Sequence, residues 1–229
     1  MEYRNELKFV VSDPEMEKIR HRLLPVMEQD MHQWESGYTI RSVYFDDIYD
    51  SCLSENEAGT DYRKKYRIRI YNGDSAFIRL EKKIKYHGMT QKITQRLSRE
   101  EADLLLEADP EKLSEIILPE TNHLIRNVYC EMIRKKLSPK CIVEYERFAF
   151  VESRGNVRIT FDRNIAGSRQ VEGFYDSEID FFPVMPAGLH ILEIKYDELL
   201  PHYILQAIDT GHLRRQSYSK YCAVRKITG

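Results

Sequence analysis

The stretch that decides the fold is Arg63–Tyr71, which reads RKKYRIRIY. In a β-strand, alternate side chains point to the same face. From Arg63 to Arg69 one face of this segment therefore carries only long cationic side chains, while the other carries Tyr66, Ile68 and Ile70 after Lys64. The cationic face consists of Arg63, Lys65, Arg67 and Arg69. The pattern predicts a strand that packs its apolar face on a core and keeps its other face for a negatively charged partner.

The same alternation recurs along the chain. Asn72-Gly73-Asp74 is a hairpin turn signal, and it joins this strand, predicted at about 60–72, to a second one at about 75–86. Further strands are predicted at about 2–11, 38–46, 88–97, 141–152, 156–162 and 189–197. Their charged faces include Arg4, Glu6, Lys8, Arg79, Glu81, Lys83, Lys85, Lys92, Arg96, Arg158, Asp162, Glu193 and Lys195.

Two interpretations of these charged faces differ in where the faces point. In a one-sided antiparallel sheet, each polar face would be solvated. However, like charges directly opposite each other destabilise a ladder, and cations dominate several neighbouring strands here. If the sheet closes into a barrel with its charged faces inside, the interior becomes a cationic channel for a polyanion, and the sheet loses its free edges. For Lys92 and Arg96, surface exposure remains an equal alternative.

The remaining segments predict helices around the barrel. Ser12-Asp13-Pro14 begins one helix, and Ser98 with Glu101 forms a capping box at the start of a helical region that continues, with breaks, to Leu137. Two more helices are expected from Pro201 and from Ser217, whereas 163–188 is loop-rich. We therefore expect an α+β fold, a closed antiparallel barrel of about eight strands with flanking helices, in one domain over residues 1–229.

Composition restricts the function. The net charge is −2, with 42% hydrophobic and 31% charged residues among 229. This balance gives no bulk attraction to nucleic acid or to anionic membranes, so we expect neither partner. No stretch is long enough to span a bilayer and no apolar signal region is evident. Four scattered cysteines without a CxxC pair are typical of a reduced protein. We therefore expect a cytoplasmic location.

The ordered motifs resemble those of a known family. The chain is similar to the VTC-type polyphosphate polymerase domain of the CYTH-like triphosphate tunnel metalloenzyme superfamily, over nearly its whole length. The motifs are RNELKF from Arg4, VYFD from Val43, YRIRIY from Tyr66, LEKK from Leu80, EYER from Glu144, VRITFD from Val157, LEIK from Leu192 and YSKY from Tyr218.

This resemblance implies roles for fourteen residues. The groups implied in catalysis are Lys8, Arg67, Arg69, Lys83, Arg147, Arg158 and Lys220. Those implied in substrate binding are Arg63, Lys65, Lys92, Tyr145, Lys195 and Ser219. Glu193 is the implied ligand of Mn²⁺ or Mg²⁺, although a salt bridge to a lysine is its alternative, and Lys220 could instead be an exposed lysine on a final helix.

The resemblance also implies a reaction. ATP or another nucleoside triphosphate would donate a phosphoryl group to a growing inorganic polyphosphate chain. Triphosphate hydrolases of the superfamily begin with Glu-x-Glu-x-Lys, whereas Arg4 stands at the first glutamate position here. The alternatives are an inorganic triphosphatase and a non-catalytic module that binds polyphosphate.

Overall fold

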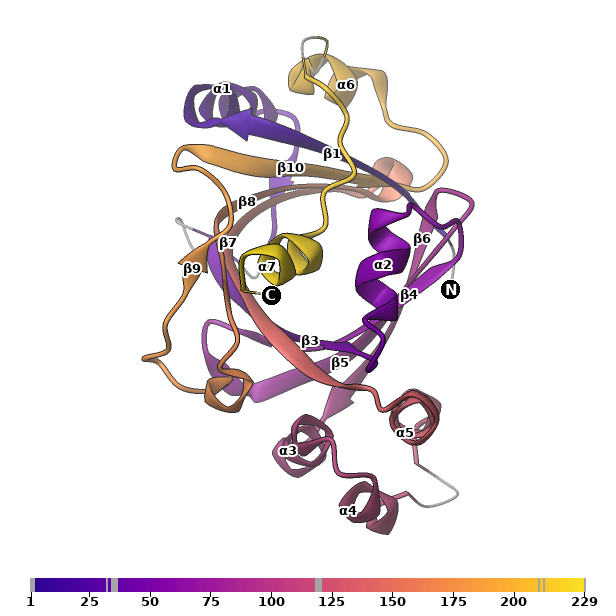
Figure 1. Cartoon of the computed structure of the whole chain (residues 1–229). Coiled ribbons are helices and arrows are strands. Elements are labelled where there is room, and N and C mark those ends of the chain that lie inside the picture. Colours follow the sequence, from indigo (N-terminus) through magenta and orange to yellow (C-terminus); the bar gives the residue numbers. More distant parts are fainter. Residues whose placement is uncertain are drawn as a thin grey trace.

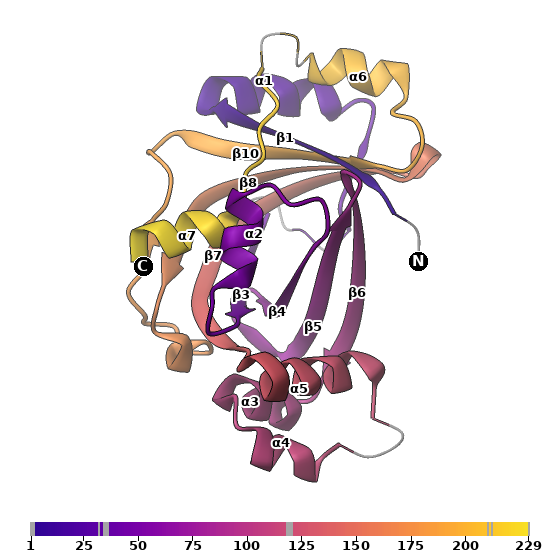
Figure 2. The ribbon, with the colours of Figure 1, turned by 45° about the vertical axis from the view of Figure 1, so that its right-hand side comes forward.

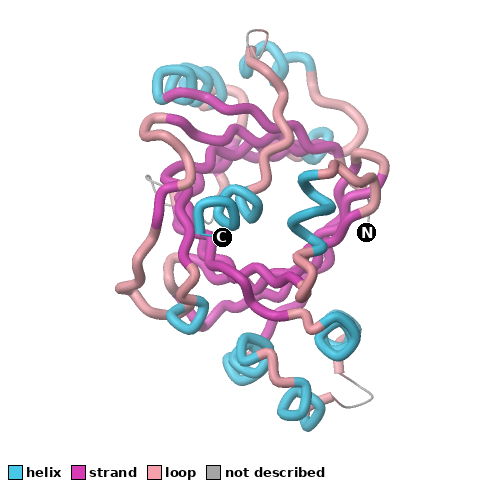
Figure 3. The backbone as a smooth tube through the Cα atoms, in the orientation of Figure 1, coloured by secondary structure: helices cyan, strands magenta, loops and turns pink. Residues whose placement is uncertain are grey.

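The chain folds into an antiparallel sheet that curves around a central space (Figure 1, Figure 3). The computed structural model describes residues 3–31, 33, 37–117, 121–209, 211 and 213–228. Eight strands follow one another around the sheet, each hydrogen-bonded to the next. In spatial order they are β1 (Asn5–Ser12), β10 (Leu189–Tyr196), β8 (Val157–Ser168), β7 (Ser138–Glu152), β3 (Tyr38–Asp46), β4 (Arg63–Tyr71), β5 (Asp74–Tyr86) and β6 (Met89–Leu97). The short β2 (Glu28–Gln29) pairs with β7, and β9 (Phe182–Pro183) pairs with β8.

The two outermost strands, β1 and β6, meet at a single point. Arg4 and Thr90 form one antiparallel bridge, with N–H to O distances of 2.9 and 3.0 Å in the two directions. The predicted α+β barrel of eight strands is therefore confirmed, but its closure is incomplete. From this bridge β1 and β6 run in opposite directions. The two strands therefore do not pair with each other at any other described residue.

Helices cover the outer face of the barrel in two groups (Figure 2). The first is α1 (Asp13–Leu23) with α6 (His202–Ile208), and the second is α3 (Arg99–Glu107) with α4 (Pro110–Glu115) and α5 (His123–Lys135). Each group packs on the apolar faces of the strands beneath it. Leu192 and Phe161 belong to the first core, and Ile68 and Leu80 belong to the second. Because the apolar faces are used outside, the charged faces of the same strands turn inward.

Two helices lie at one end of the barrel. These are α2 (Ser51–Glu57) and the C-terminal α7 (Lys220–Thr228), which appear within the ring of strands in Figure 1. They complete a third core, in which the rings of Tyr44 and Tyr221 stack with centroids 5.4 Å apart. Gly167 on β8 makes room for α7, because a Cβ there would lie 2.3 Å from a methyl carbon of Val224.

The predicted elements agree with the structure except at a few boundaries. The strand expected at 156–162 continues to Ser168, into the region interpreted as loop-rich. The final helix begins at Lys220 rather than at Ser217. The first strand begins at Asn5, and residue 2 lies outside the described residues. The single-domain organisation stays a prediction. Of the helices that the structure describes, none is long and apolar enough to cross a membrane.

Candidate functional site in the barrel interior

A cavity of about 750 Å³ occupies the barrel interior. Among the described residues, fifteen lysines and arginines line it, against two glutamates. The lining includes every inward-facing position of β4, from Arg63 at its start to Tyr71 at its end. At ~3.3 Å per residue the lined length is about 26 Å. The cavity is therefore a tunnel that follows a whole strand, with a large excess of positive charge.

All fourteen residues predicted from the sequence line this tunnel. They are Lys8, Arg63, Lys65, Arg67, Arg69, Lys83, Lys92, Tyr145, Arg147, Arg158, Glu193, Lys195, Ser219 and Lys220. They come from seven strands and from the C-terminal segment, so only the folded barrel brings them together. Their individual roles stay predictions. Lys92 has a side chain that is 46% exposed yet still lines the tunnel, whereas Arg96 is exposed and is not among the lining residues.

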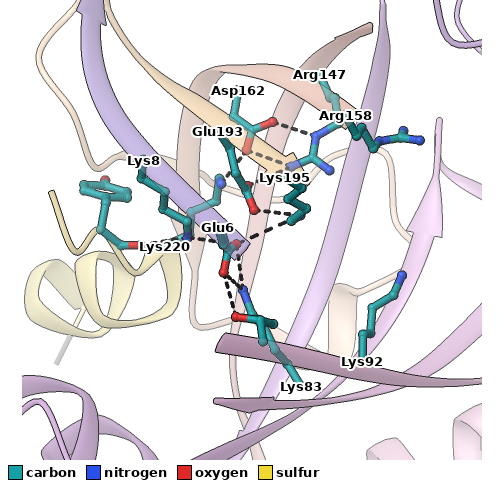
Figure 4. A network of polar contacts seen from close by, with 12 residues as sticks. Glu6, Lys8, Lys83, Lys92, Arg147, Arg158, Asp162, Glu193, Lys195 and Lys220 are labelled. Atoms are coloured by element: carbon teal, nitrogen blue, oxygen red, sulfur yellow. Dashed lines mark hydrogen bonds and ion pairs between the residues drawn. The ribbon is translucent and has the colours of Figure 1, made fainter. Parts of the chain in front are cut away.

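One wall of the tunnel holds buried carboxylates surrounded by cations (Figure 4). Glu6 on β1 accepts hydrogen bonds from Lys83 at 2.8 and 2.9 Å. Glu193 on β10 pairs with Lys195 at 2.6 Å, so the lysine salt bridge considered for Glu193 is present. The carboxylates thus lie among cations of their own strands, Lys8 on β1 and Lys195 on β10, and beside Lys83 from β5.

Asp162 on β8 anchors two further cations of this wall. It accepts both hydrogen bonds of a bidentate pair with Arg147, at 2.7 and 2.8 Å, and one from Lys220 at 2.5 Å. Lys220 is buried, which rules out the exposed alternative for this residue. Although burial would raise the pKa of Asp162, Arg147 and Lys220 outweigh it and lower that pKa to about 2. Asp162 therefore stays ionised and fixes both cations toward the tunnel.

The pKa of Glu193 follows the same balance. Burial alone would raise it, but the charges of Lys195 and Lys8 hold the pKa well below its usual value. The pKa of Lys8 moves in the opposite direction, because the negative charges of Glu6 and Glu193 outweigh the lowering caused by burial. Both groups are therefore charged at neutral pH.

The opposite wall, made by β4 and β5, has one buried carboxylate. Glu81 accepts a hydrogen bond from Arg67 at 2.7 Å and one from Lys92 at 3.1 Å. Arg69 lies 3.7 Å from the same carboxylate and donates to the hydroxyl of Tyr145 at 3.1 Å. These contacts fix the two arginines with their guanidinium groups facing the tunnel.

Other cations on this wall have no carboxylate partner among the described residues. They are Arg63, Lys65, Arg79 and Lys85, of which Arg63 and Lys85 face each other directly across β4 and β5. Burial lowers the pKa of Lys65 to about 8. Burial followed by the charge of Arg63 lowers the pKa of Lys85. The like charges repel one another in the free protein, and an anion in the tunnel would relieve this repulsion.

The C-terminal segment closes over the tunnel beside β1. Gln216 donates its N–H to the carbonyl of Lys8 at 2.9 Å, next to a bridge between Phe9 and Arg215. Ser219 accepts a hydrogen bond from Lys65 at 2.8 Å. This contact joins the start of α7 to the far wall, so the segment completes the cationic ring where β1 has no β6 partner.

Sequence reasoning did not assign a role to every lining residue, and Arg79, Lys85, Tyr44 and Arg215 show why. Arg79 and Lys85 share the alternation that identified their neighbours on β5, so the signal was present. Tyr44 is uncharged, so the pattern of cations did not mark it. Its hydroxyl accepts a hydrogen bond from Arg67 at 2.8 Å. Burial alone would raise the pKa of Tyr44, but the charges of Arg67 and Arg69 lower it to about 8. Arg215 comes from an irregular segment, where no periodicity marks a tunnel face.

The donor set at the carboxylate wall fits a hard divalent cation. Mg²⁺ is commonly bound by one or two carboxylates together with substrate phosphates. Glu193 and Glu6 both line the tunnel, and the ammonium group of Lys195 contacts both carboxylates, at 2.6 Å and 4.0 Å respectively. No group of three or more His, Cys, Asp or Glu side chains that could hold a metal occurs in the described part of the chain. A metal here would therefore take its remaining ligands from phosphate and water.

Comparison with known proteins identifies the family. The sequence profile described as the VTC domain matches residues 3–228. The chain belongs to the VTC domain family. The match spans nearly the whole chain, so the resemblance inferred from the motifs is confirmed. No curated protein sequence matches this VTC domain.

One solved structure shares the fold of this VTC domain, and two others resemble it with TM-scores below 0.5. A protein from Vibrio parahaemolyticus, provisionally described as an adenylate cyclase, is 10% identical over 97% of each chain, with a TM-score of 0.53. One from Bacillus halodurans with the same provisional description is 18% identical over 90% of each chain, with a TM-score of 0.49. One from Pyrococcus horikoshii is 15% identical over 99% of this chain and 100% of the other, with a TM-score of 0.47. At these identities the Vibrio structure shows a common fold only.

Proposed function

We propose that this VTC domain is a polyphosphate polymerase, which transfers the terminal phosphoryl group of ATP or another nucleoside triphosphate to a growing inorganic polyphosphate chain. The observation that carries the proposal is the tunnel, in which fifteen cations oppose two glutamates along the whole of β4. A single pocket would suffice for one phosphate group. A lined tunnel suits a linear anion with charge at regular intervals.

The proposed reaction needs no base. The bond between the γ-phosphorus and the oxygen bridging it to the β-phosphate breaks, and a terminal oxygen of the chain bonds to the γ-phosphorus. ADP leaves with the electron pair of the broken bond. The attacking oxygen is already ionised, so no proton has to be removed. Catalysis by positioning and charge stabilisation is sufficient for this chemistry.

The tunnel side chains have the geometry for this task. Arg67, Arg69 and Arg147 are each held by a hydrogen bond to a neighbouring side chain, so their donors are oriented before the substrate arrives. Arg147, Lys8 and Lys220 on the carboxylate wall face Arg67 and Arg69 on the β4–β5 wall, and with Lys83 and Arg158 these cations would neutralise charge on the transferring group. Tyr145 and Ser219 would orient phosphate oxygens, while Arg63, Lys65, Lys92 and Lys195 would extend the track. Preorganised donors of this kind cost little reorganisation during the reaction.

Glu193, with Glu6 beside it, would hold Mn²⁺ or Mg²⁺. The ion would supply additional positive charge next to phosphate oxygens when bound. Arg4 stands at the first acidic position of the related hydrolases. Its guanidinium group donates a hydrogen bond to the carboxylate of Asp197 at 2.8 Å. This difference in the acidic set favours transfer to a phosphate chain over hydrolysis.

The test is incubation of the purified protein with ATP and Mn²⁺, followed by gel staining for long polymer. Arg69→Met is the matched inactive variant. It removes a tunnel donor but leaves Glu81 paired with Arg67 and Lys92, so the fold should persist. Lys82→Thr, on the outer face of β5, is the active control. We expect polymer from wild type and Lys82→Thr, and none from Arg69→Met.

Two other results would each replace the proposal with a specific alternative. Free phosphate without polymer would identify an inorganic triphosphatase. Tight binding of tripolyphosphate with no turnover in any divalent metal would identify a non-catalytic polyphosphate-binding module.

A further inference from the structure

The tunnel lining changes character at the C-terminal end of β4. Tyr71, the last residue of β4, and Tyr38, the first residue of β3, both line the cavity there. Phe77 shares the inner face of β5 with Arg79. We call Tyr38, Tyr71 and Phe77 the aromatic cluster. Tyr38 and Tyr71 line the tunnel, and Phe77 adjoins Tyr71 without itself being among the lining residues.

The rings of the aromatic cluster form a continuous set. The centroids of Tyr38 and Tyr71 are 6.0 Å apart, and those of Tyr71 and Phe77 are 6.3 Å apart. The guanidinium of Arg79 lies over Phe77 at 4.5 Å and over Tyr71 at 5.8 Å. The hydroxyl of Tyr38 accepts a hydrogen bond from Arg158 at 3.1 Å. The cluster is thus fixed in place at a rim that also presents flat guanidinium groups.

The other end of β4 has a different lining. Arg63 and Lys85 stand there opposite each other, and both line the cavity. Aromatic faces are electron-rich and do not favour phosphate oxygens, whereas cations and hydroxyls do. The two ends of the tunnel therefore suit two different parts of a guest, one planar and uncharged, the other anionic.

We propose that the aromatic cluster is the subsite for the nucleobase of the nucleoside triphosphate. This inference rests on the proposed function and adds a direction to it. The base stacks on Tyr71 and Tyr38 at the C-terminal end of β4, with Arg79 beside it, and the phosphates extend toward Arg67 and Arg69. The growing chain then occupies the opposite end and leaves past Arg63 and Lys85.

The test compares two ligands that differ in the base. Isothermal titration calorimetry measures the affinity of wild type and Tyr71→Leu for the β,γ-imido analogue of ATP and for inorganic tripolyphosphate. Stacking of a base on an aromatic side chain is worth ~1–3 kcal/mol, which is about 5- to 150-fold in affinity. We expect Tyr71→Leu to weaken the nucleotide by this factor and to leave tripolyphosphate within about twofold, because phosphate contacts do not involve the ring.

Two control variants separate stacking from other effects. Tyr71→Phe keeps the ring and should bind both ligands like wild type. Tyr86→Leu removes an exposed aromatic on the outer face of the same hairpin and should change neither affinity. Unchanged tripolyphosphate binding by Tyr71→Leu also shows that the variant is folded.

Three outcomes would overturn the subsite. Equal loss of both ligands in Tyr71→Leu would mean that the ring only positions Arg79. No loss of either would mean that the base lies elsewhere. Failure of the wild type to bind both ligands would reject the subsite together with the tunnel. A failure of polymer synthesis from ATP, in contrast, would reject the polymerase alone, since the two affinities are measured without turnover.

Discussion

Lys85→Thr should raise the stability of the ligand-free protein and lower its affinity for tripolyphosphate. Lys85 lies directly opposite Arg63 in the β4–β5 ladder, and neither has a carboxylate partner among the described residues. Two like charges in this position destabilise a sheet by roughly 0.2–1 kcal/mol. The lowered pKa of Lys85, caused by burial and then by Arg63, has the direction that this repulsion requires. Thr introduces a β-branched side chain, which suits a strand.

The two effects of Lys85→Thr can be measured separately. At ~2–4 °C per kcal/mol for a chain of this size, relief of the repulsion should raise the Tm by about 0.5–4 °C in calorimetry. Loss of a charge-assisted contact to phosphate, worth ~1.5–3 kcal/mol, should lower the affinity for tripolyphosphate by roughly 10- to 150-fold. Lys82→Thr, on the outer face of the same strand, should leave that affinity unchanged.

The reasoning would be refuted by a Lys85→Thr protein that binds tripolyphosphate as tightly as wild type. A parallel fall in Tm and affinity would also refute it, because it would show that Lys85 contributes to the fold rather than opposing it.

Three further predictions concern protonation, the carboxylate wall and α7. The affinity for tripolyphosphate should fall as the pH rises from 7 to 9.5, because burial lowers the pKa of Lys65, Lys92 and Lys83 to about 8 and neutral amines bind phosphate poorly. The calorimetric slope should be shallower in Lys65→Arg/Lys92→Arg than in wild type, and equal slopes would contradict the assignment. Asp162→Asn should lower the free energy of unfolding, measured in urea, by about 3–5 kcal/mol, because it leaves Arg147 and Lys220 buried without their counter-charge. A loss below 1 kcal/mol would show that the burial of these two cations does not require the charge of Asp162. Gly167→Ala should destabilise the fold by ~1–3 kcal/mol through overpacking against Val224. Gly167→Ala/Val224→Ala should recover most of that loss in the same assay, whereas a double variant as unstable as the single one would show that the strain does not come from Val224.

Alternation in the sequence was enough to predict most of the tunnel. Arg63, Lys65, Arg67 and Arg69 share one face in any extended strand, and the excess of cations over several such strands implied an enclosed anion site. The outward apolar faces, such as that of Ile68, followed from the same pattern. Each of these inferences depends only on the two-residue period of a strand.

Other features depend on register and tertiary contacts, which periodicity does not contain. The single bridge between Arg4 and Thr90 reflects how far the strands are staggered around the barrel. The bidentate pair between Arg147 and Asp162 depends on the pairing of β7 with β8. Arg215 lies in an irregular segment that reaches the tunnel only because it runs along β1.

The most direct test of the account is a crystal structure of the protein soaked with tripolyphosphate and Mn²⁺. We predict phosphate groups inside the barrel, with oxygens within hydrogen-bond distance of Arg67 and Arg69 on one wall and of Arg147, Lys8 and Lys220 on the other. Phosphates found only on the outer surface of a saturated crystal, with the barrel interior free of them, would contradict the claim that the inward-facing cations form a polyphosphate tunnel.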